Sequence, residues 1–193
     1  MDAVRVLLEV STAREGPDRE HARMEAARLI GSLPDQFEDQ LNALLQDRSA
    51  DVARLALRAA AAVGKASSIT LVVARLGDQE LAGDAADALV AFGDRAVPVL
   101  RAALEHATTP TSTRHAVPDV LQRIATQEAE QVLVEFLLDT DPVLRLRTVS
   151  ALNRLRQQHG NRMLERDLIE TVLAAEIVGH YRSYQLLGRL HET

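Results

Sequence analysis

Histidine, aspartate and glutamate are the side chains of this sequence that could hold a metal ion, because the chain contains no cysteine. Two metal ligands on one face of a helix need a spacing such as His-x-x-x-His. None of the histidines has that spacing to another; they lie at positions 21, 106, 115, 159, 180 and 191. His21 and Glu25 are four residues apart, but a single pair on an acidic helix is typical of a solvated surface. We therefore expect no metal and no cofactor.

Signatures of covalent catalysis and of phosphate binding are also missing. The sequence has no Gly-x-Ser-x-Gly motif and no glycine-rich phosphate loop. The lack of cysteine excludes thiol nucleophiles and disulfides. These absences favour a binding or scaffolding role, and we expect that the protein is not an enzyme.

The charge of the chain bears on its partners. The formal net charge is −6, so the diffuse positive field of a non-specific nucleic-acid binder is lacking, and no nucleic acid is expected as a partner. Lys65 is the only lysine among 22 basic residues. Such arginine enrichment is compatible with planar recognition of an anion, but it also arises from surface ion pairs and genome composition.

The composition favours helices. Hydrophobic residues make up 47% of the chain and aromatic residues only 3%, with no tryptophan. A core of alanine, leucine and valine suits closely stacked helices, and no run of alternating β-branched residues indicates a strand. No apolar run approaches the roughly 18–20 residues that span a bilayer, and Asp2, Arg5 and Glu9 interrupt any signal peptide. We expect a cytoplasmic protein without direct membrane insertion.

Break signals recur along the sequence at nearly constant intervals. They fall at Gly31, Gly64, Gly93, Ala125 and Gly160, which are 33, 29, 32 and 35 residues apart. Each interval contains two helical patterns separated by a polar turn. The fold predicted from this period is an all-α, right-handed superhelix of about five hairpins, in which each hairpin buries its apolar side against its neighbours.

The stretch from Leu137 to Gly160 illustrates one unit. A first helix ends at Leu137-Leu138, Asp141 is the expected N-cap of a second helix, and Pro142 opens that helix. Its apolar face comprises Leu144, the methyl of Thr148, Ala151, Leu152 and Leu155. The remaining helices are expected at about 2–10, 17–30, 37–45, 49–63, 69–76, 81–92, 96–106, 114–124, 126–138 and 161–190, the last either as one long helix or as two with a break at Gly179.

Three details of these helices are specific expectations. The buried face of 17–30 is expected to comprise Ala22, Ala26, Leu29 and Ile30. Asp94 is expected to cap the helix that follows it. The helix containing Pro118 is expected to be kinked or to start late, near Arg114, because proline disrupts a helix interior.

Two stretches, LLQDRSADVARLALRAAAAVG and FLLDTDPVLRLRTVSALNRL, carry a family likeness. Both resemble HEAT repeats, with a leucine pair, an aspartate in the turn, and an apolar residue five positions later that is often followed by arginine. Asp139, Leu144 and Arg145 fit this pattern, whereas Ala53 occupies the place where arginine is usual. The resemblance implies one solenoid domain over 1–193, with a divergent N-terminal hairpin (1–34), HEAT-like repeats (35–160) and a C-terminal cap (161–193).

A narrower resemblance rests on four segments in order: ALVAFGDRAVPVLRAAL, TRHAVPDVLQRI, DPVLRLRTVSALNRLR and the end of the chain near HYRSYQLLGRL. The series is similar to the HEAT-repeat extension of bacterial ATP/ADP-translocase-like and major-facilitator transporters. This resemblance implies a cytoplasmic accessory module at the inner face of the plasma membrane. Its partner is then another protein or the adjacent domains of a longer chain.

Two sets of polar residues are the candidate sites. Arg145 lies close to Asp139 and Asp141, which predicts an arginine–aspartate ladder between adjacent turns, with Asp47 as the counterpart in an earlier repeat; the alternative is an anion contact. The exposed face of the second helices is expected to line a concave surface through Arg54, Arg58, Asp84, Asp87, Arg114, Asp119, Gln122, Arg147, Ser150 and Arg154.

The signs of these charges alternate from repeat to repeat. That alternation favours ion pairs between repeats and a mixed-charge surface that binds protein, and it argues against a track for phosphates. The function expected from the sequence is therefore a non-enzymatic interaction or regulatory scaffold. The alternatives are a solenoid that binds an anionic ligand, with Arg147 and Arg154 as its anchors, and a HEAT-like DNA glycosylase or metal hydroxylase.

Overall fold

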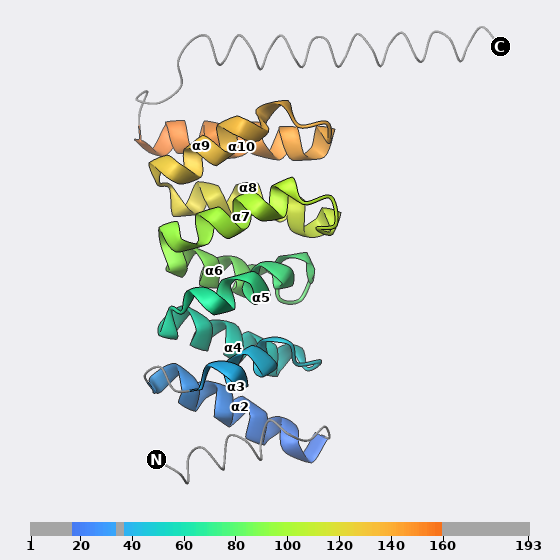
Figure 1. Ribbon diagram of the computed structural model, residues 1–193, viewed down its shortest axis with the longest axis vertical. Coiled ribbons are helices and arrows are strands. Elements are labelled where there is room, and N and C mark those ends of the chain that lie inside the picture. The colour runs from blue at the N-terminus through green and yellow to red at the C-terminus, as the bar shows by residue number, and fades with distance from the viewer. Residues whose placement is uncertain (1–16, 34–36, 160–193) are drawn as a thin grey trace, which may run out of the picture.

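The structure of the protein is a computed structural model, which describes residues 17–33 and 37–159. Helical hairpins follow one another along the long axis of the molecule (Figure 1). The α-helices are α2 (Pro17–Ser32), α3 (Glu38–Leu45), α4 (Ala50–Val63), α5 (Ile69–Ala74), α6 (Ala82–Phe92), α7 (Val97–Glu105), α8 (Thr111–Ile124), α9 (Gln127–Glu135) and α10 (Pro142–His159). Short 3₁₀ helices connect or extend them: η1 (Ala66–Ser68), η2 (Arg75–Gly77), η3 (Gly93–Ala96) and η4 (Phe136–Leu138).

The helices form two layers. The second helices α2, α4, α6, α8 and α10 each pack against the next one in the series, and the first helices α3, α5, α7 and α9 do the same. Within each hairpin the first helix also packs on the second. The described residues contain no strand. The prediction of an all-α solenoid is therefore confirmed; the expected helices at about 2–10 and 161–190 lie outside the described residues.

The core runs between the two layers through every described hairpin. It consists almost entirely of alanine, valine and leucine, with Phe37 and Phe92 as its buried aromatic residues. The face predicted for α10 is confirmed, because Leu144, Thr148, Ala151, Leu152 and Leu155 are all buried. Small side chains at the layer contacts let neighbouring helices approach closely: a Cβ on Gly31 of α2 would lie 3.3 Å from the Cα of Ala59 in α4.

Two of the predicted breaks end their helices in the left-handed conformation. Gly64 ends α4 with a φ of 69°, and Ala125 ends α8 with a φ of 57°. In both cases the backbone N–H of the capping residue bonds a carbonyl four residues earlier, Ala60 or Leu121. Glycine adopts this conformation without steric cost, whereas the Cβ of alanine makes it unfavourable.

Two local expectations are wrong. Asp94 does not cap α7, because η3 precedes that helix and Ala96 is its N-cap. Helix α8 begins at Thr111 and not near Arg114, since the Arg114 N–H already bonds the carbonyl of Pro110 at 3.0 Å and closes the first turn. Pro118 therefore lies inside α8, where it is buried.

The buried face of α2 also differs from the expected one. Ala26 and Ile30 are buried as expected, together with Ala27, but Ala22 is exposed and Leu29 is 42% exposed. The contact with α4 decides this orientation, because Gly31 at the C-terminal end of α2 lies directly against Ala59. The sequence of α2 alone does not contain this restraint.

Candidate interaction surface on the second helices

An arginine–aspartate ladder connects neighbouring hairpins. The Nε of Arg23 in α2 lies 2.7 Å from a carboxylate oxygen of Asp47, which follows α3 in the next hairpin. In the same way Arg114 in α8 lies 3.2 Å from Asp139, in the turn that precedes α10. Each arginine thus reaches forward from a second helix to the turn of the following hairpin.

Arg145 contacts the turn that precedes its own helix. Its guanidinium donates to the backbone carbonyls of Asp139 at 2.9 Å and Thr140 at 3.3 Å, within its own hairpin. Arg145 and Arg114 both lie four residues after the N-cap of their helices, α10 and α8. The two residues are therefore equivalent in position, and the preceding repeat provides a partner of the Asp139 carboxylate through Arg114.

Asp141 makes a second contact between α8 and the start of α10. Its carboxylate accepts hydrogen bonds from the N–H groups of Val143 at 2.9 Å and Leu144 at 3.3 Å, so it is the N-cap of α10 as predicted. His115 of α8 lies against it, with 2.6 Å between Nε2 and a carboxylate oxygen. The hydrogen bond from His115 and those from the two backbone N–H groups lower the pKa of Asp141.

The exposed sides of α4, α6, α8 and α10, here called the second-helix face, carry ion pairs between successive repeats. In α4, Arg54 and Arg58 lie 3.1 Å and 3.4 Å from the carboxylate of Asp84 in α6. Asp51 pairs with Arg54 from the first turn of the same helix. Despite desolvation, the hydrogen bonds to Asp84 and Asp51 raise the pKa of Arg54, which keeps it charged.

The pairing continues towards the C-terminal end of the described residues. Asp87 of α6 pairs with Arg123 of α8 at 2.6 Å. Asp119 of α8 accepts from Arg154 of α10 at 2.8 Å and lies 3.6 Å from Arg147. The alternation of sign predicted from the sequence thus corresponds to contacts between neighbouring helices.

Three of the candidate residues are placed differently from the rest. Arg114 lies in the first turn of α8 and bonds the carbonyl of Leu104 at 3.2 Å in addition to Asp139. Gln122 is buried, with its amide donating to Gln158 of α10 at 3.1 Å. The hydroxyl of Ser150 bonds the carbonyl of Leu146 at 2.8 Å in its own helix. These groups are therefore used within the solenoid.

Arg123 belongs to this surface although it is absent from the candidate residues of the sequence. It lies four residues after Asp119, so the two side chains emerge on the same side of α8. Spacing on the helix could have identified Arg123. The partner, Asp87, could not be identified in this way because it lies in the preceding repeat.

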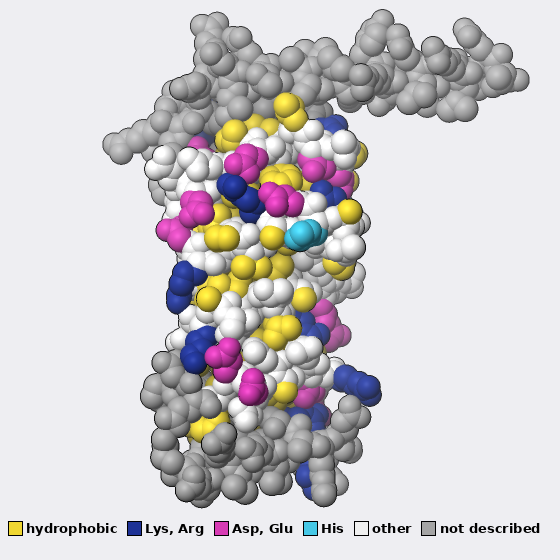
Figure 2. All heavy atoms as spheres, viewed as in Figure 1, with side chains coloured by type: hydrophobic (Ala, Val, Ile, Leu, Met, Phe, Trp, Pro, Cys, Tyr) yellow, Lys and Arg dark blue, Asp and Glu magenta, His cyan; other side chains and the backbone are white. Residues whose placement is uncertain are grey.

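The opposite side of the molecule, formed by the first helices, has a mixed surface. Figure 2 shows hydrophobic, acidic and basic side chains interspersed on this face, without an extended zone of one charge. Leu71, Val99 and Val134 are partly buried apolar residues of α5, α7 and α9 that pack against the core. Arg101 of α7 lies 3.0 Å from Glu135 of α9, so this layer too is connected by an ion pair.

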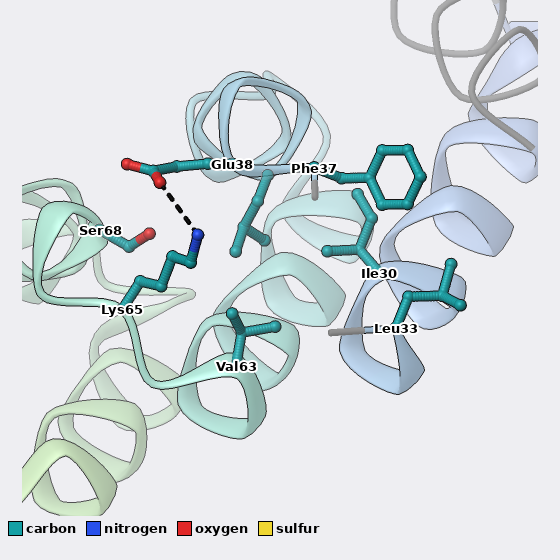
Figure 3. Close-up of a pocket in the computed structure, with 8 residues that line it drawn as sticks. Ile30, Leu33, Phe37, Glu38, Val63, Lys65 and Ser68 are labelled. Carbon is teal, nitrogen blue, oxygen red and sulfur yellow. Dashed lines mark hydrogen bonds and ion pairs between the residues drawn. The ribbon is translucent and has the colours of Figure 1, made fainter. Parts of the chain in front are cut away.

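A small recess lies where α2, α3 and α4 meet the beginning of the third hairpin (Figure 3). Its lining is mostly apolar, and Lys65 extends across it to Glu38, with 3.3 Å between Nζ and a carboxylate oxygen. Hydrogen bonds from Ser67 and Lys65 lower the pKa of Glu38, so the ion pair is maintained. The ammonium group thus neutralises a neighbouring carboxylate, which makes the recess a poor site for an anion.

Two further features concern the described part of the chain. Residues 17–33 and 37–159 contain no group of three or more potential ligands that could hold a metal ion. Within the same residues, no helix combines the length and apolar character needed to cross a bilayer.

Comparison with known families agrees with the architecture. A family model for HEAT repeats matches residues 74–153, which extend from the end of α5 into α10. None of the curated proteins is matched to the chain by sequence. Residues 74–153 are therefore similar in sequence to HEAT repeats, and they include the hairpin formed by α7 and α8 and most of the hairpin formed by α9 and α10.

Proposed function

We propose that the protein is a non-enzymatic scaffold that binds another protein through the second-helix face. The observation that supports this is the series of exposed ion pairs on α4, α6, α8 and α10. The side chains of Asp87, Arg58 and Arg154 are 72%, 67% and 57% exposed, so a partner can reach them. HEAT repeats generally mediate protein interactions, and this general role is consistent with the family match.

The energetics of such pairs suit a binding surface. An exposed ion pair contributes only about 0–1 kcal/mol to folding, so exchanging it for a pair with a partner costs little. Charges of both signs at fixed spacing also select the partner, because a mismatched surface places like charges together. The face therefore favours a protein with alternating charges over a uniformly charged ligand.

The test uses photo-crosslinking amino acids placed at single positions in the cells that make the protein. Three variants carry the probe on the second-helix face, at Arg58, Asp87 and Arg154. Three controls carry it at exposed positions of the first helices: Thr70, Gln131 and Glu128. We expect one shared partner to crosslink from the second-helix face and not from the controls. Equal yields from both faces would contradict the proposal.

We propose further that the scaffold is a cytoplasmic accessory module of a bacterial transporter-like membrane protein. The support is the order of four segments in the sequence that are similar to the extension of such transporters. The check is the parent reading frame. Hydrophobic spans encoded in frame next to these residues support this assignment, and a complete reading frame without them contradicts it.

Binding of an anionic ligand is a second candidate function, supported by the pair of arginines on α10. Arg147 and Arg154 share the single carboxylate of Asp119, so one positive charge remains in excess at this point. Asp119→Asn removes the competing carboxylate. If an anion binds here, the variant binds inorganic pyrophosphate more tightly in a titration, whereas Arg154→Gln binds it more weakly. Equal affinities in both variants would eliminate this candidate.

A further inference from the structure

The large exposed apolar side chains of the described residues are confined to the two ends of the stack. Leu29 belongs to α2, and Leu138, Val143 and Leu146 belong to the last hairpin, where they are 56%, 42% and 66% exposed. Hairpins between these ends bury their large apolar residues because a neighbour covers each side. Leu138, Val143 and Leu146 are called the end face below.

In α4 and α8, the residue at the position equivalent to Leu146 contacts the next repeat. Leu146 lies five residues after the N-cap of α10, as Arg54 does in α4 and His115 does in α8. Arg54 reaches Asp84 of the next second helix at 3.1 Å, and His115 reaches Asp141, the N-cap of the next second helix, at 2.6 Å. The equivalent residue at the end of the stack is apolar, so the element that covers it must also be apolar.

We propose that the end face binds residues 161–190 of this chain, which form a sixth hairpin on the last described repeat. The sequence of this segment fits the role. Leu164, Leu168 and Val172 recur at four-residue spacing before Gly179, and Tyr181 and Tyr184 follow it three residues apart. Arg54 in α4 and His115 in α8 make polar contacts from this position, and the equivalent residue of α6 is Ala86. At the end of the stack we expect Leu146 to pack against the tyrosines.

The length of the segment supports the same arrangement. Helix α10 has 18 residues, and residues 161–178, which precede Gly179, also number 18. A helix of this length that returns antiparallel along α10 brings Gly179 back to the N-terminal end of α10. Leu146 lies near that end, so a second helix beginning at about residue 180 starts beside it. Asp84, the partner of Arg54, likewise lies in the first turn of its helix.

The direct connection favours this segment over a second copy of the chain. Residues 161–190 follow α10 immediately, so their effective concentration at the end face is of the order of millimolar. A second copy must reach the same face from bulk solution. The test therefore has to distinguish contacts within one chain from contacts between chains.

Disulfide trapping in the full chain provides this distinction, since the natural sequence has no cysteine. Leu146→Cys is combined in turn with cysteine at positions 181, 182, 183 and 184, four residues that sample one turn of a helix. We expect oxidation to give an intramolecular disulfide with positions 181 and 184, which share a helix face, and at least tenfold less with 182 and 183. Gln46→Cys combined with Tyr181→Cys is the control, because Gln46 is an exposed residue of an interior hairpin.

The outcomes are read on non-reducing gels and by thermal unfolding. A disulfide-linked dimer at low protein concentration shows a second copy on the end face and overturns the proposal. Equal trapping at all four positions, or none, also overturns it. In the full chain, Leu146→Glu is expected to lower the melting temperature by about 5 °C, whereas Gln79→Glu, at an exposed turn position, leaves it unchanged. Equal melting of the two variants contradicts burial of the end face.

Discussion

Thr148 is a core residue of α10 whose hydroxyl lacks a hydrogen-bond partner. The residue is fully buried, and its Oγ1 has no partner among the described residues. The sequence pattern requires only the methyl group of this side chain, which packs in the apolar stripe with Leu144, Ala151 and Leu152. A buried hydroxyl without a partner retains the cost of losing its bonds to water.

Thr148→Val should therefore stabilise the protein. Valine keeps the shape of threonine and replaces the hydroxyl with a methyl group, so the free energy of unfolding should rise by about 1 kcal/mol. Urea unfolding followed by circular dichroism measures this change. Thr70→Val, at an exposed position of α5, is the control and should alter stability by less than about 0.5 kcal/mol. A loss of stability in Thr148→Val would mean that the hydroxyl is bonded.

Asp141 should make the stability of the contact between α8 and α10 dependent on pH. The hydrogen bond from His115, followed by those from Val143 and Leu144, lowers the pKa of Asp141 in the folded state. The stabilisation that the carboxylate provides is therefore complete above its unfolded pKa of about 4, and it is lost as the pH falls through the lower folded pKa.

Asp141→Asn isolates this contribution, because asparagine retains a good N-cap without the charge. The variant should be less stable than the natural protein at pH 6, and the difference should shrink as the pH falls from 5 to 2. Urea unfolding at each pH measures the difference, with Asp39→Asn, an exposed residue of α3, as the control. A difference that stays constant over this range would contradict the prediction.

At the scale of the elements, the period of the sequence predicts most helices because local spacing determines which residues face the core. The stripes of α6 and α10 are the clearest cases. The errors occur where a neighbouring element decides the outcome. Helix α8 starts early through the bond from Arg114 to Pro110, and α2 turns Leu29 outwards because Gly31 packs on Ala59. Neither contact can be read from spacing within one helix.

Ala125, which ends α8 with a φ of 57°, should gain stability on replacement by glycine. An L-residue in the left-handed region costs roughly 1 kcal/mol, and Ala125→Gly removes this cost at the expense of some unfolded-state entropy. We expect a net gain of about 0.5–1 kcal/mol in the free energy of unfolding. Ala62→Gly, at an exposed position inside α4, should instead lose about 1 kcal/mol. Two changes of the same sign would contradict the argument.

Gly77 and Gly83 provide a matched pair of glycines with opposite surroundings. A Cβ on Gly77 would lie 2.7 Å from Oγ1 of Thr113 and 2.8 Å from Oγ of Ser112, at the start of α8. A Cβ on Gly83, in α6, would meet nothing within 4 Å. Gly77→Ala should lower the free energy of unfolding by about 1–3 kcal/mol, whereas Gly83→Ala should raise it by about 0.5–1 kcal/mol. Thermal unfolding of both variants checks the two signs.

On the scale of the whole molecule, the sequence predicts a stack of hairpins and a charged face, but not how the charges pair. The pairs Asp87–Arg123 and Asp119–Arg154 join residues 36 and 35 positions apart, and their formation depends on the register between repeats. The same holds for the ladder, in which Arg114 of the preceding repeat pairs with the carboxylate of Asp139. The period of the repeats identifies the candidate residues, whereas the stacking of the repeats determines which residues they pair with.

The effect of a core substitution on amide protection should depend on the position of the substituted residue along the stack. Leu89 of α6 and Leu133 of α9 are both fully buried, and replacement of either by alanine costs about 2–5 kcal/mol. Because each hairpin contacts only its neighbours, Leu133→Ala should mainly lower amide protection in α9 and α10 and leave α4 protected. Leu89→Ala lies in the middle of the stack and should lower protection on both sides, in α4 and in α8.

Hydrogen exchange of the full chain, followed by mass spectrometry of peptides, compares these two variants with the natural protein. The comparison tests the architecture itself, since a closed bundle would share the loss among all its helices. Uniform loss of protection in Leu133→Ala, including in α4, would contradict a nearest-neighbour stack. A loss restricted to α9 and α10 means that one end can open while α4 and α6 stay folded, so the part of the second-helix face on α4 and α6 does not depend on the last repeat.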